Sequence, residues 1–216
     1  TVSILDPLML KSLPAEQVLA TGMDAITHSL EAFLSNRASI FTDALALRSL
    51  KVLWKHIANA AYAVNNLESR GEMLVASIMS VQASGNALLG LVHATSDQIS
   101  AFHHVPHGMS NALMLPAVME YNLPVASEKF VELNSITGDV PASEANNPEA
   151  FLKAISRLYR RLGLPLRLPD VVDPASFEDW AQRTSENPFF APAPRRPTIA
   201  ETVALYARAK AGLEWL

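Results

Sequence analysis

Asp24 and His28 stand four residues apart in a stretch, Ala20 to Ala32, that is otherwise typical of a buried helix. Side chains at this spacing lie on the same face of a helix, one turn apart. A buried carboxylate beside a buried imidazole is costly unless both find partners, and a metal ion is one such partner. The pair therefore indicates a metal site, with a helix that has one hydrated edge as the alternative.

Two further histidines could complete the shell. His93 follows a helix rich in small residues, and His107 follows Pro106, where a new helix can begin. The chain contains no cysteine, so thiolate ligands, disulfides and a cysteine nucleophile are excluded. One carboxylate and three imidazoles suit a borderline divalent cation, Fe²⁺ or Zn²⁺ first, with Ni²⁺, Co²⁺ and Mn²⁺ as competitors. The predicted ligands are thus Asp24, His28, His93 and His107.

The remaining three histidines have simpler interpretations. His103 and His104 lie in a polar kink, where an exposed or hydrogen-bonded loop pair is expected. His56 stands near a helix end, where a surface imidazole interacts favourably with the helix dipole. None of them is predicted to bind the metal.

Composition narrows the class of protein. The 216 residues are 50% hydrophobic and 18% charged, which fits one globular domain, or one with a small subdomain. The net charge is −4 and no basic stripe occurs, so a nucleic-acid partner is not expected. No run approaches the roughly 20 apolar residues of a membrane span, and the sequence shows no signal-peptide pattern, so no membrane partner is expected. The absence of cysteine suits a cytoplasmic protein.

The spacing of apolar residues and of capping residues predicts an all-helical domain. A capping box between Thr198 and Glu201 predicts the start of the last helix. Segment 138–148 is expected to be a polar loop, and the proline-rich segment 187–197 an extended surface loop. The other predicted helices are 14–36, 38–64, 67–90, 91–102, 107–121, 125–135, 149–162 and 175–184.

Two features suggest that this sequence is a piece of a longer protein. It starts at Thr1, and Val2 to Leu5 is typical of the tail of a strand. The eight glycines are scattered, and no glycine-rich phosphate loop can be written. The chain is therefore not expected to bind a dinucleotide by itself.

Three motifs in this order resemble those of the iron-containing alcohol dehydrogenases. The resemblance runs from about residue 5 to 125, and more loosely to the end. The matching residues are Gly22-Met23-Asp24-Ala25 with His28, Glu31 and Ala32; Asn86-Ala87 with Gly90 and Val92-His93-Ala94; and Pro106-His107-Gly108 with Asn111-Ala112, Leu115-Pro116, Val118 and Tyr121-Asn122.

The resemblance implies a two-domain enzyme of the dehydroquinate-synthase-like fold. Residues 1–7 would end an N-terminal domain that binds NAD or NADP, and residues 8–216 would form the helical metal-binding domain. The family's four metal ligands fall on the four residues chosen above. The implied substrate is a small alcohol or carbonyl compound, and the implied reaction is their interconversion by hydride transfer. This domain alone is expected to be inactive.

The sequence departs from the family pattern at two positions. Asp97 replaces a histidine that in the family usually follows the third ligand by four residues. It is the candidate base, and the alternatives are that it attracts a second cationic group or that it adds negative charge near the metal. Ser84 replaces a frequent phenylalanine, which predicts a roomier or more polar pocket, or closer helix packing. Thr27, Glu31 and Asn111 are candidates to orient the imidazoles, with local helix contacts as the simpler interpretation.

Other functions remain as alternatives. The chain could be a non-catalytic or degenerate metal-binding module, or it could serve a related reaction such as maleylacetate reduction or a lyase step. The apolar segment 109–119 could face a missing domain or a partner subunit, so a homo-oligomer is also a candidate.

Overall fold

The structure is a computed structural model, and it describes residues 2–212. In this range the chain forms nine α-helices, several short 3₁₀ turns and no strand, which confirms the predicted all-helical class. Each predicted helix is present, with its ends displaced by a few residues. The helices are α1 (Ala15–Leu34), α2 (Ile40–Tyr62), α3 (Leu67–Ala87), α4 (Leu91–His103), α5 (His107–Asn122), α6 (Ser127–Thr137), α7 (Ala150–Leu162), α8 (Phe177–Glu186) and α9 (Ile199–Ala211).

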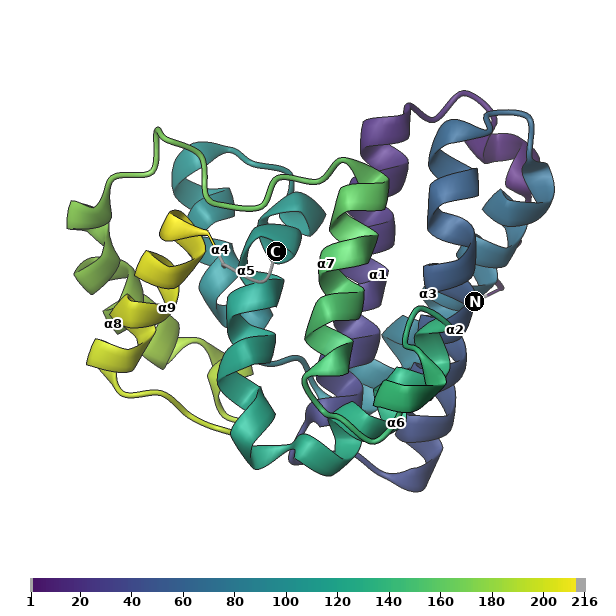
Figure 1. The fold of residues 1–216 in the computed structure, drawn as a ribbon. Coiled ribbons are helices and arrows are strands. Elements are labelled where there is room, and N and C mark those ends of the chain that lie inside the picture. The colour runs from purple at the N-terminus through teal and green to yellow at the C-terminus, as the bar shows by residue number, and fades with distance from the viewer. Residues whose placement is uncertain (1, 213–216) are drawn as a thin grey trace.

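Helix α1 is the central element of the fold. It packs against α2, α3 and α5, and most of its side chains are buried. Helices α4, α5, α8 and α9 form a second group beside it, seen to the left of α1 and α7 in Figure 1. Helix α1 thus contacts both the α2–α3 pair and this second group, and its residues Glu31 and Asp24 bond to residues of α4 and α5.

Capping residues explain where several helices begin and end. The predicted capping box is present, since the Thr198 hydroxyl accepts from the Glu201 backbone N–H and the Glu201 carboxylate accepts from that of Thr198. A second box joins Ser39 to Thr42 at the start of α2. Gly163 ends α7 in the left-handed conformation, with φ of +62°, which glycine adopts without strain.

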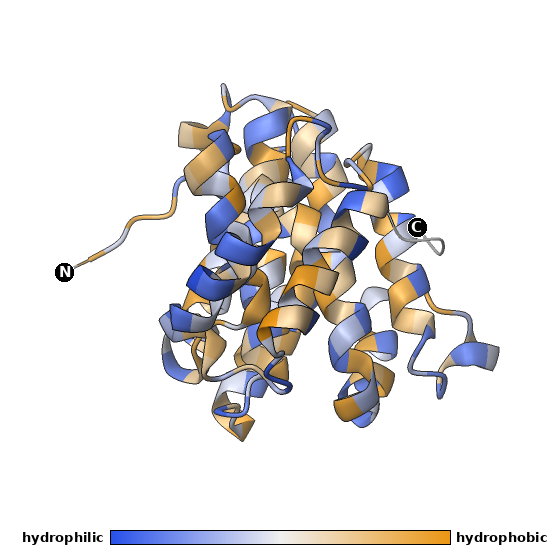
Figure 2. Ribbon diagram, turned by 90° about the vertical axis from the view of Figure 1, so that its left-hand side faces the viewer, coloured by the Kyte–Doolittle hydropathy of each residue, from blue (hydrophilic) through white to orange (hydrophobic). Residues whose placement is uncertain are grey.

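The structure corrects the prediction for the first residues. Residues 2–6 have no regular secondary structure, and Figure 2 shows this segment projecting away from the body of the domain. Val2 and Ile4 are each 88% exposed. A strand needs a neighbouring strand for its backbone hydrogen bonds, and the described residues offer none.

The segment 187–197 is also not an extended surface loop. It contains a 3₁₀ turn, Pro188–Phe190, and it buries Pro192, Ala193 and Pro197. Asn36 fixes this segment by donating from its backbone to the Pro192 carbonyl and from its side chain to the Ala193 carbonyl. Proline excludes helix here, but it does not prevent the segment from packing.

The apolar segment 109–119 belongs to the core of this domain. Residues 110–119 are all buried in the chain itself, so this segment is not a free face for a missing domain or a partner subunit. Within residues 2–212, no single helix is long and apolar enough to cross a membrane. The α3–α4 pair would qualify by length and composition together, but it is bent by 109°.

Candidate metal centre

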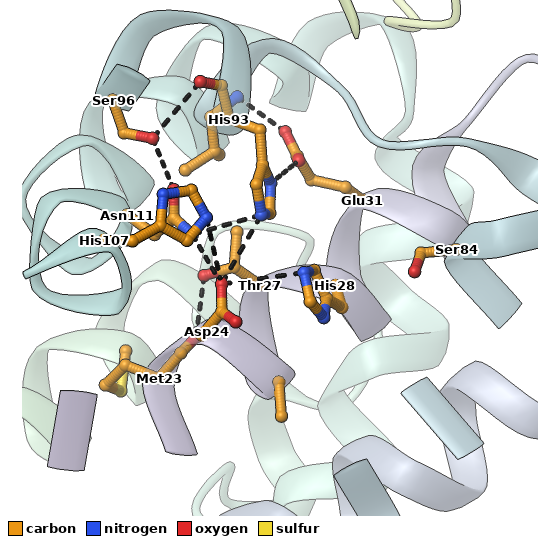
Figure 3. Close-up of polar contacts among 12 residues, drawn as sticks. Met23, Asp24, Thr27, His28, Glu31, Ser84, His93, Ser96, His107 and Asn111 are labelled. Carbon is orange, nitrogen blue, oxygen red and sulfur yellow. Dashed lines mark hydrogen bonds and ion pairs between the residues drawn. The ribbon is translucent and has the colours of Figure 1, made fainter. Parts of the chain in front are cut away.

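Three helices bring the four predicted ligands to one place. Asp24 and His28 lie one turn apart on α1, His93 lies in the first turn of α4, and His107 is the first residue of α5. In Figure 3 the three imidazoles surround the Asp24 carboxylate. The Nε2 atoms of His28, His93 and His107 lie 3.6, 3.5 and 3.5 Å from the Asp24 Oδ1 atom.

The donor set has the composition and spacing of a metal site. Ligand atoms of Asp24, His28 and His93 all lie within 4.8 Å of one another. His107 adds a third imidazole beside the same carboxylate oxygen. Three nitrogens and one oxygen on a common centre fit a borderline divalent cation such as Fe²⁺ or Zn²⁺.

A glycine permits the approach of α5 to α1. A Cβ atom built on Gly108 would lie 1.9 Å from the Ala20 carbonyl oxygen, so no other residue fits there without moving a helix. Pro106 precedes the first residue of α5 and starts the helix at His107. This close contact places His107 beside Asp24.

Glu31 links α1 to the start of α4. Its carboxylate accepts the backbone N–H groups of Gly90 (2.9 Å) and Val92 (2.5 Å), and it lies 2.6 Å from the Nδ1 atom of His93. The Glu31 side chain is only 3% exposed. Its role is therefore not the local helix contact that was the simpler expectation, because all three partners lie about sixty residues away in the chain.

Asn111 also reaches beyond its own helix. Its amide nitrogen donates to Asp24 Oδ1 at 2.8 Å and lies 3.1 and 3.2 Å from the Nε2 atoms of His93 and His107. The Ser96 hydroxyl donates to the other end of the amide. Thr27 differs, since its hydroxyl donates to the Met23 carbonyl in the same helix. Asn111 thus contacts three of the four predicted ligands.

The charges around the site favour a cation. Burial alone would lower the pKa of His93, but hydrogen bonds to Asp24 and Glu31, together with their charges, raise it to about 9. Burial alone would raise the pKa of Asp24, but the hydrogen bond with His93 and the charges of the three imidazoles lower it overall. Burial lowers the pKa of His28. Two carboxylates therefore surround His93, and positive charge in this position is stabilised.

The site is open on one side. The side chain of His107 is 46% exposed and that of Asp24 is 26% exposed, whereas that of His93 is 2% exposed. His93 therefore forms the floor of the site, and His107 lies at its mouth. A small molecule can reach the ligand cluster from the side of His107.

Asp97, the candidate base, lies at this mouth. It follows His93 by one turn of α4, and its Oδ1 atom lies 3.9 Å from the Nδ1 atom of His107. Its Oδ2 atom accepts from the side-chain amide of Asn187 at 2.9 Å. The carboxylate is thus held between the predicted metal ligand His107 and the segment that follows α8.

The other histidines lie outside the ligand cluster. His103 packs edge-on against Trp180, and His104 ends α4 in the left-handed conformation with φ of +53°. His56 is half-buried, and its Nδ1 atom lies 3.1 Å from the Ser69 hydroxyl, so it is not a plain surface residue.

Two residues near the site were not anticipated from the sequence. Phe189 lies edge-on to the His93 ring, with 6.2 Å between ring centroids. Leu88 connects α3 to α4 with φ of +65°, an unfavourable backbone conformation for leucine. The Asn187-Pro188 dipeptide could have indicated a turn before Phe189, but no local pattern places that turn beside His93.

The sequence and the fold match known proteins. The family model described as Fe-containing alcohol dehydrogenase family, C-terminal, matches residues 18–210. The 1,3-propanediol dehydrogenase of Klebsiella pneumoniae is 35% identical over 212 residues, which cover 97% of this chain and 55% of that relative. The NAD-dependent methanol dehydrogenase of Bacillus methanolicus is 32% identical over 167 residues, which cover 76% of this chain and 44% of that relative.

A solved structure of a 1,3-propanediol oxidoreductase has the same fold. It superposes with a TM-score of 0.90 at 34% sequence identity, over 94% of this chain and 54% of that chain. The present chain therefore spans about half the length of the curated relatives that it matches.

Proposed function

The chain belongs to the iron-containing alcohol dehydrogenase family, whose C-terminal region it spans, and from this premise we propose that it is the metal-binding catalytic half of an NAD(P)-dependent oxidoreductase. The proposed reaction interconverts an alcohol and an aldehyde or ketone. The printed names of the relatives support this class, since they include a propanediol dehydrogenase and an NAD-dependent methanol dehydrogenase.

The proposed metal ligands are Asp24, His28, His93 and His107. The observation that carries this proposal is the position of three imidazole nitrogens within 3.6 Å of one carboxylate oxygen. Fe²⁺ is the first candidate because of the family, and Zn²⁺ is the second because the donor set suits it equally. When bound, such a cation supplies Lewis acidity toward an alcohol or carbonyl oxygen.

The surrounding side chains hold the ligands in place. The Glu31 carboxylate holds the Nδ1 atom of His93, which leaves Nε2 directed at the centre of the cluster. The side-chain amide of Asn111 holds the Asp24 carboxylate through a hydrogen bond of 2.8 Å. Because these side chains already fix the positions of the proposed metal ligands, binding of the metal requires less reorganisation of the site.

Asp97 is the proposed proton acceptor. It lies at the open mouth of the site, beside His107, and Asn187 fixes one of its two oxygens. The other oxygen is free of that contact and can accept a proton from a substrate hydroxyl, either directly or through water. This carboxylate takes the role that the family usually gives to a histidine at the same position.

The nicotinamide cofactor supplies the hydride chemistry, and we propose that a separate nucleotide-binding domain holds it. No glycine-rich phosphate loop occurs in the sequence, so the residues that bind the pyrophosphate belong elsewhere. Residues 1–7 are proposed to be the end of that domain.

The decisive experiment measures metal content. Protein purified without a polyhistidine tag is analysed by mass spectrometry for bound metal, beside a His93→Ala/His107→Ala double variant. About one equivalent in the parent and little in the double variant are expected. A His56→Ala variant is the matched control and should retain the metal. An absence of metal in the parent, even after anaerobic addition of Fe²⁺ or Zn²⁺, would refute the proposed site.

A further inference from the structure

An apolar pocket of about 300 Å³ lies beside the candidate metal centre. His28 contributes to both, because its Nε2 atom faces Asp24 and its side chain also lines the pocket. The pocket is bounded by the C-terminal end of α3, by the α3–α4 connection and by the 3₁₀ turn Pro188–Phe190. A group bound at the metal centre therefore has a neighbouring space for the rest of its molecule.

Among the side chains that line the pocket, His28 is the one that can carry a charge, and it does so only when it is protonated. The lining residues are His28, Val81, Ser84, Gly85, Leu88, Leu89 and Phe189. Ser84, the one hydroxyl among them, donates to the Val81 carbonyl of its own helix at 3.3 Å. A charged substituent would lose its hydration here without gaining an ionic partner, which costs free energy. A hydrocarbon chain carries no such desolvation cost.

Contacts outside the pocket hold its walls. Leu88 is kept at φ of +65° between two helices, and Gly90, two residues on, is fixed by the Glu31 carboxylate. Strained backbone of this kind persists only where the surroundings enforce it, and it is concentrated at functional sites. Near Phe189, which also lines the pocket, the Asn187 side chain accepts from the Phe189 backbone N–H and donates to Asp97. The same contacts that position Asp97 and His93 thus also position the pocket.

We propose that this pocket binds the hydrocarbon chain of the substrate, so that the substrate class is uncharged alcohols and aldehydes with an extended apolar chain. This proposal rests on the proposed function for the chemistry at the metal centre. The binding of the chain itself depends only on the pocket.

Gly85 offers a substitution that fills the pocket without threatening the fold. It lies inside α3 and lines the pocket, and a Cβ atom built on it meets no atom within 4 Å. Replacing a helical glycine also stabilises the helix. Gly85→Leu should therefore narrow the pocket in a folded protein. Gly85→Ala is the matched control, because it gives the same helical benefit with little added volume.

The first measurement requires neither metal nor cofactor. Saturation-transfer NMR compares ethanol, butanol and hexanol binding to the 216-residue chain and to both Gly85 variants. We expect binding to strengthen with chain length, by about fourfold per methylene, in the parent and in Gly85→Ala. In Gly85→Leu this dependence should be lost. γ-Hydroxybutyrate should bind at least about tenfold more weakly than butanol, because its carboxylate finds no partner in the pocket.

The second measurement is the kcat/KM of the full-length gene product for the same alcohols with NAD⁺ and with NADP⁺. The hexanol-to-ethanol ratio of kcat/KM should fall by about tenfold in Gly85→Leu relative to the parent and to Gly85→Ala. Turnover that is absent for every alcohol, together with chain-length-dependent NMR binding, would refute the proposed function and leave the pocket assignment standing. Equal binding of all chain lengths, or a preference for the charged analogue, would refute the pocket assignment. If Gly85→Leu weakens the binding of NAD⁺ but not that of hexanol, the pocket would be assigned to the nicotinamide instead.

Discussion

The Glu31 carboxylate on α1 lies 2.6 Å from the Nδ1 atom of His93 on α4, across sixty-two residues of sequence. The same carboxylate accepts two backbone N–H groups at the start of α4. It therefore fixes the position of the helix and the orientation of the imidazole together. A buried carboxylate with three donors is well satisfied, which explains how the charge is tolerated at 3% exposure.

Replacing Glu31 should weaken metal binding. Glu31→Gln keeps the shape of the side chain but removes the charge that orients His93, and we expect metal affinity to fall by about 10- to 100-fold. Chelator competition measures this affinity, and the d–d absorbance of the Co²⁺-loaded protein reports the ligand geometry. Glu16→Gln, at the exposed start of the same helix, is the control. An unchanged affinity and spectrum in Glu31→Gln would show that Glu31 acts only on folding.

Replacing Asp97 should impair turnover without loss of metal. Asp97→Asn cannot accept a proton, so we expect kcat of the full-length enzyme to fall by about 10²- to 10⁴-fold, the usual contribution of a general base. Metal content should remain near that of the parent, because Asp97 contacts His107 only at 3.9 Å. Asp97→Glu should restore part of the activity. A parallel loss of metal and activity in Asp97→Asn would instead make Asp97 a positioning residue for His107.

Glycine should be preferred over alanine at position 88. Leu88 has φ of +65° and ψ of 169°, a region that is accessible almost only to glycine. Glycine normally lowers stability relative to alanine by about 0.5–1 kcal/mol. Here we expect Leu88→Gly to be more stable than Leu88→Ala by about 1 kcal/mol in urea unfolding. The usual order of the two variants would show that the backbone at this position is not strained.

A tyrosine replaces the hydrogen bond that a proline removes from α5. Pro116 has no N–H to donate to the Ala112 carbonyl four residues earlier, and the Tyr159 hydroxyl of α7 donates to this carbonyl at 2.5 Å. Tyr159→Phe should therefore cost about 1–3 kcal/mol of unfolding free energy. In a Pro116→Ala background the cost should be smaller, because the helix regains its own donor. Additive effects in this double-mutant cycle would contradict the proposed compensation.

The buried Tyr159 hydroxyl should also make the stability of the protein depend on pH in the alkaline range. Burial raises the pKa of Tyr159 well above its ordinary value of 10. The hydroxyl therefore stays protonated in the folded state, and its contribution to stability is complete below pH 10 and is lost as the pH rises above that value. The stability of the parent should fall more steeply above pH 10 than that of Tyr159→Phe, by up to about 1.4 kcal/mol per pH unit. Equal slopes in the parent and in Tyr159→Phe would contradict the prediction.

The helices and the predicted ligands could be identified from the sequence because their signals are local. The spacing of Asp24 and His28 follows from helix geometry alone, and the Thr198 capping box lies within four residues. The position of His107 follows from Pro106, which starts a helix. The resemblance of three ordered motifs then joined these residues into one predicted site.

Only the tertiary structure decided how these elements combine. Glu31 and Asn111 looked like local helix contacts, but they act on residues of other helices, as the distances to His93 and Asp24 show. The turn that carries Phe189 looked like surface loop, because proline patterns exclude helix but do not specify packing partners. Sequence spacing determines which residues share a face of one helix. Contacts between helices depend on how whole faces pack together, and that information is distributed over the entire core.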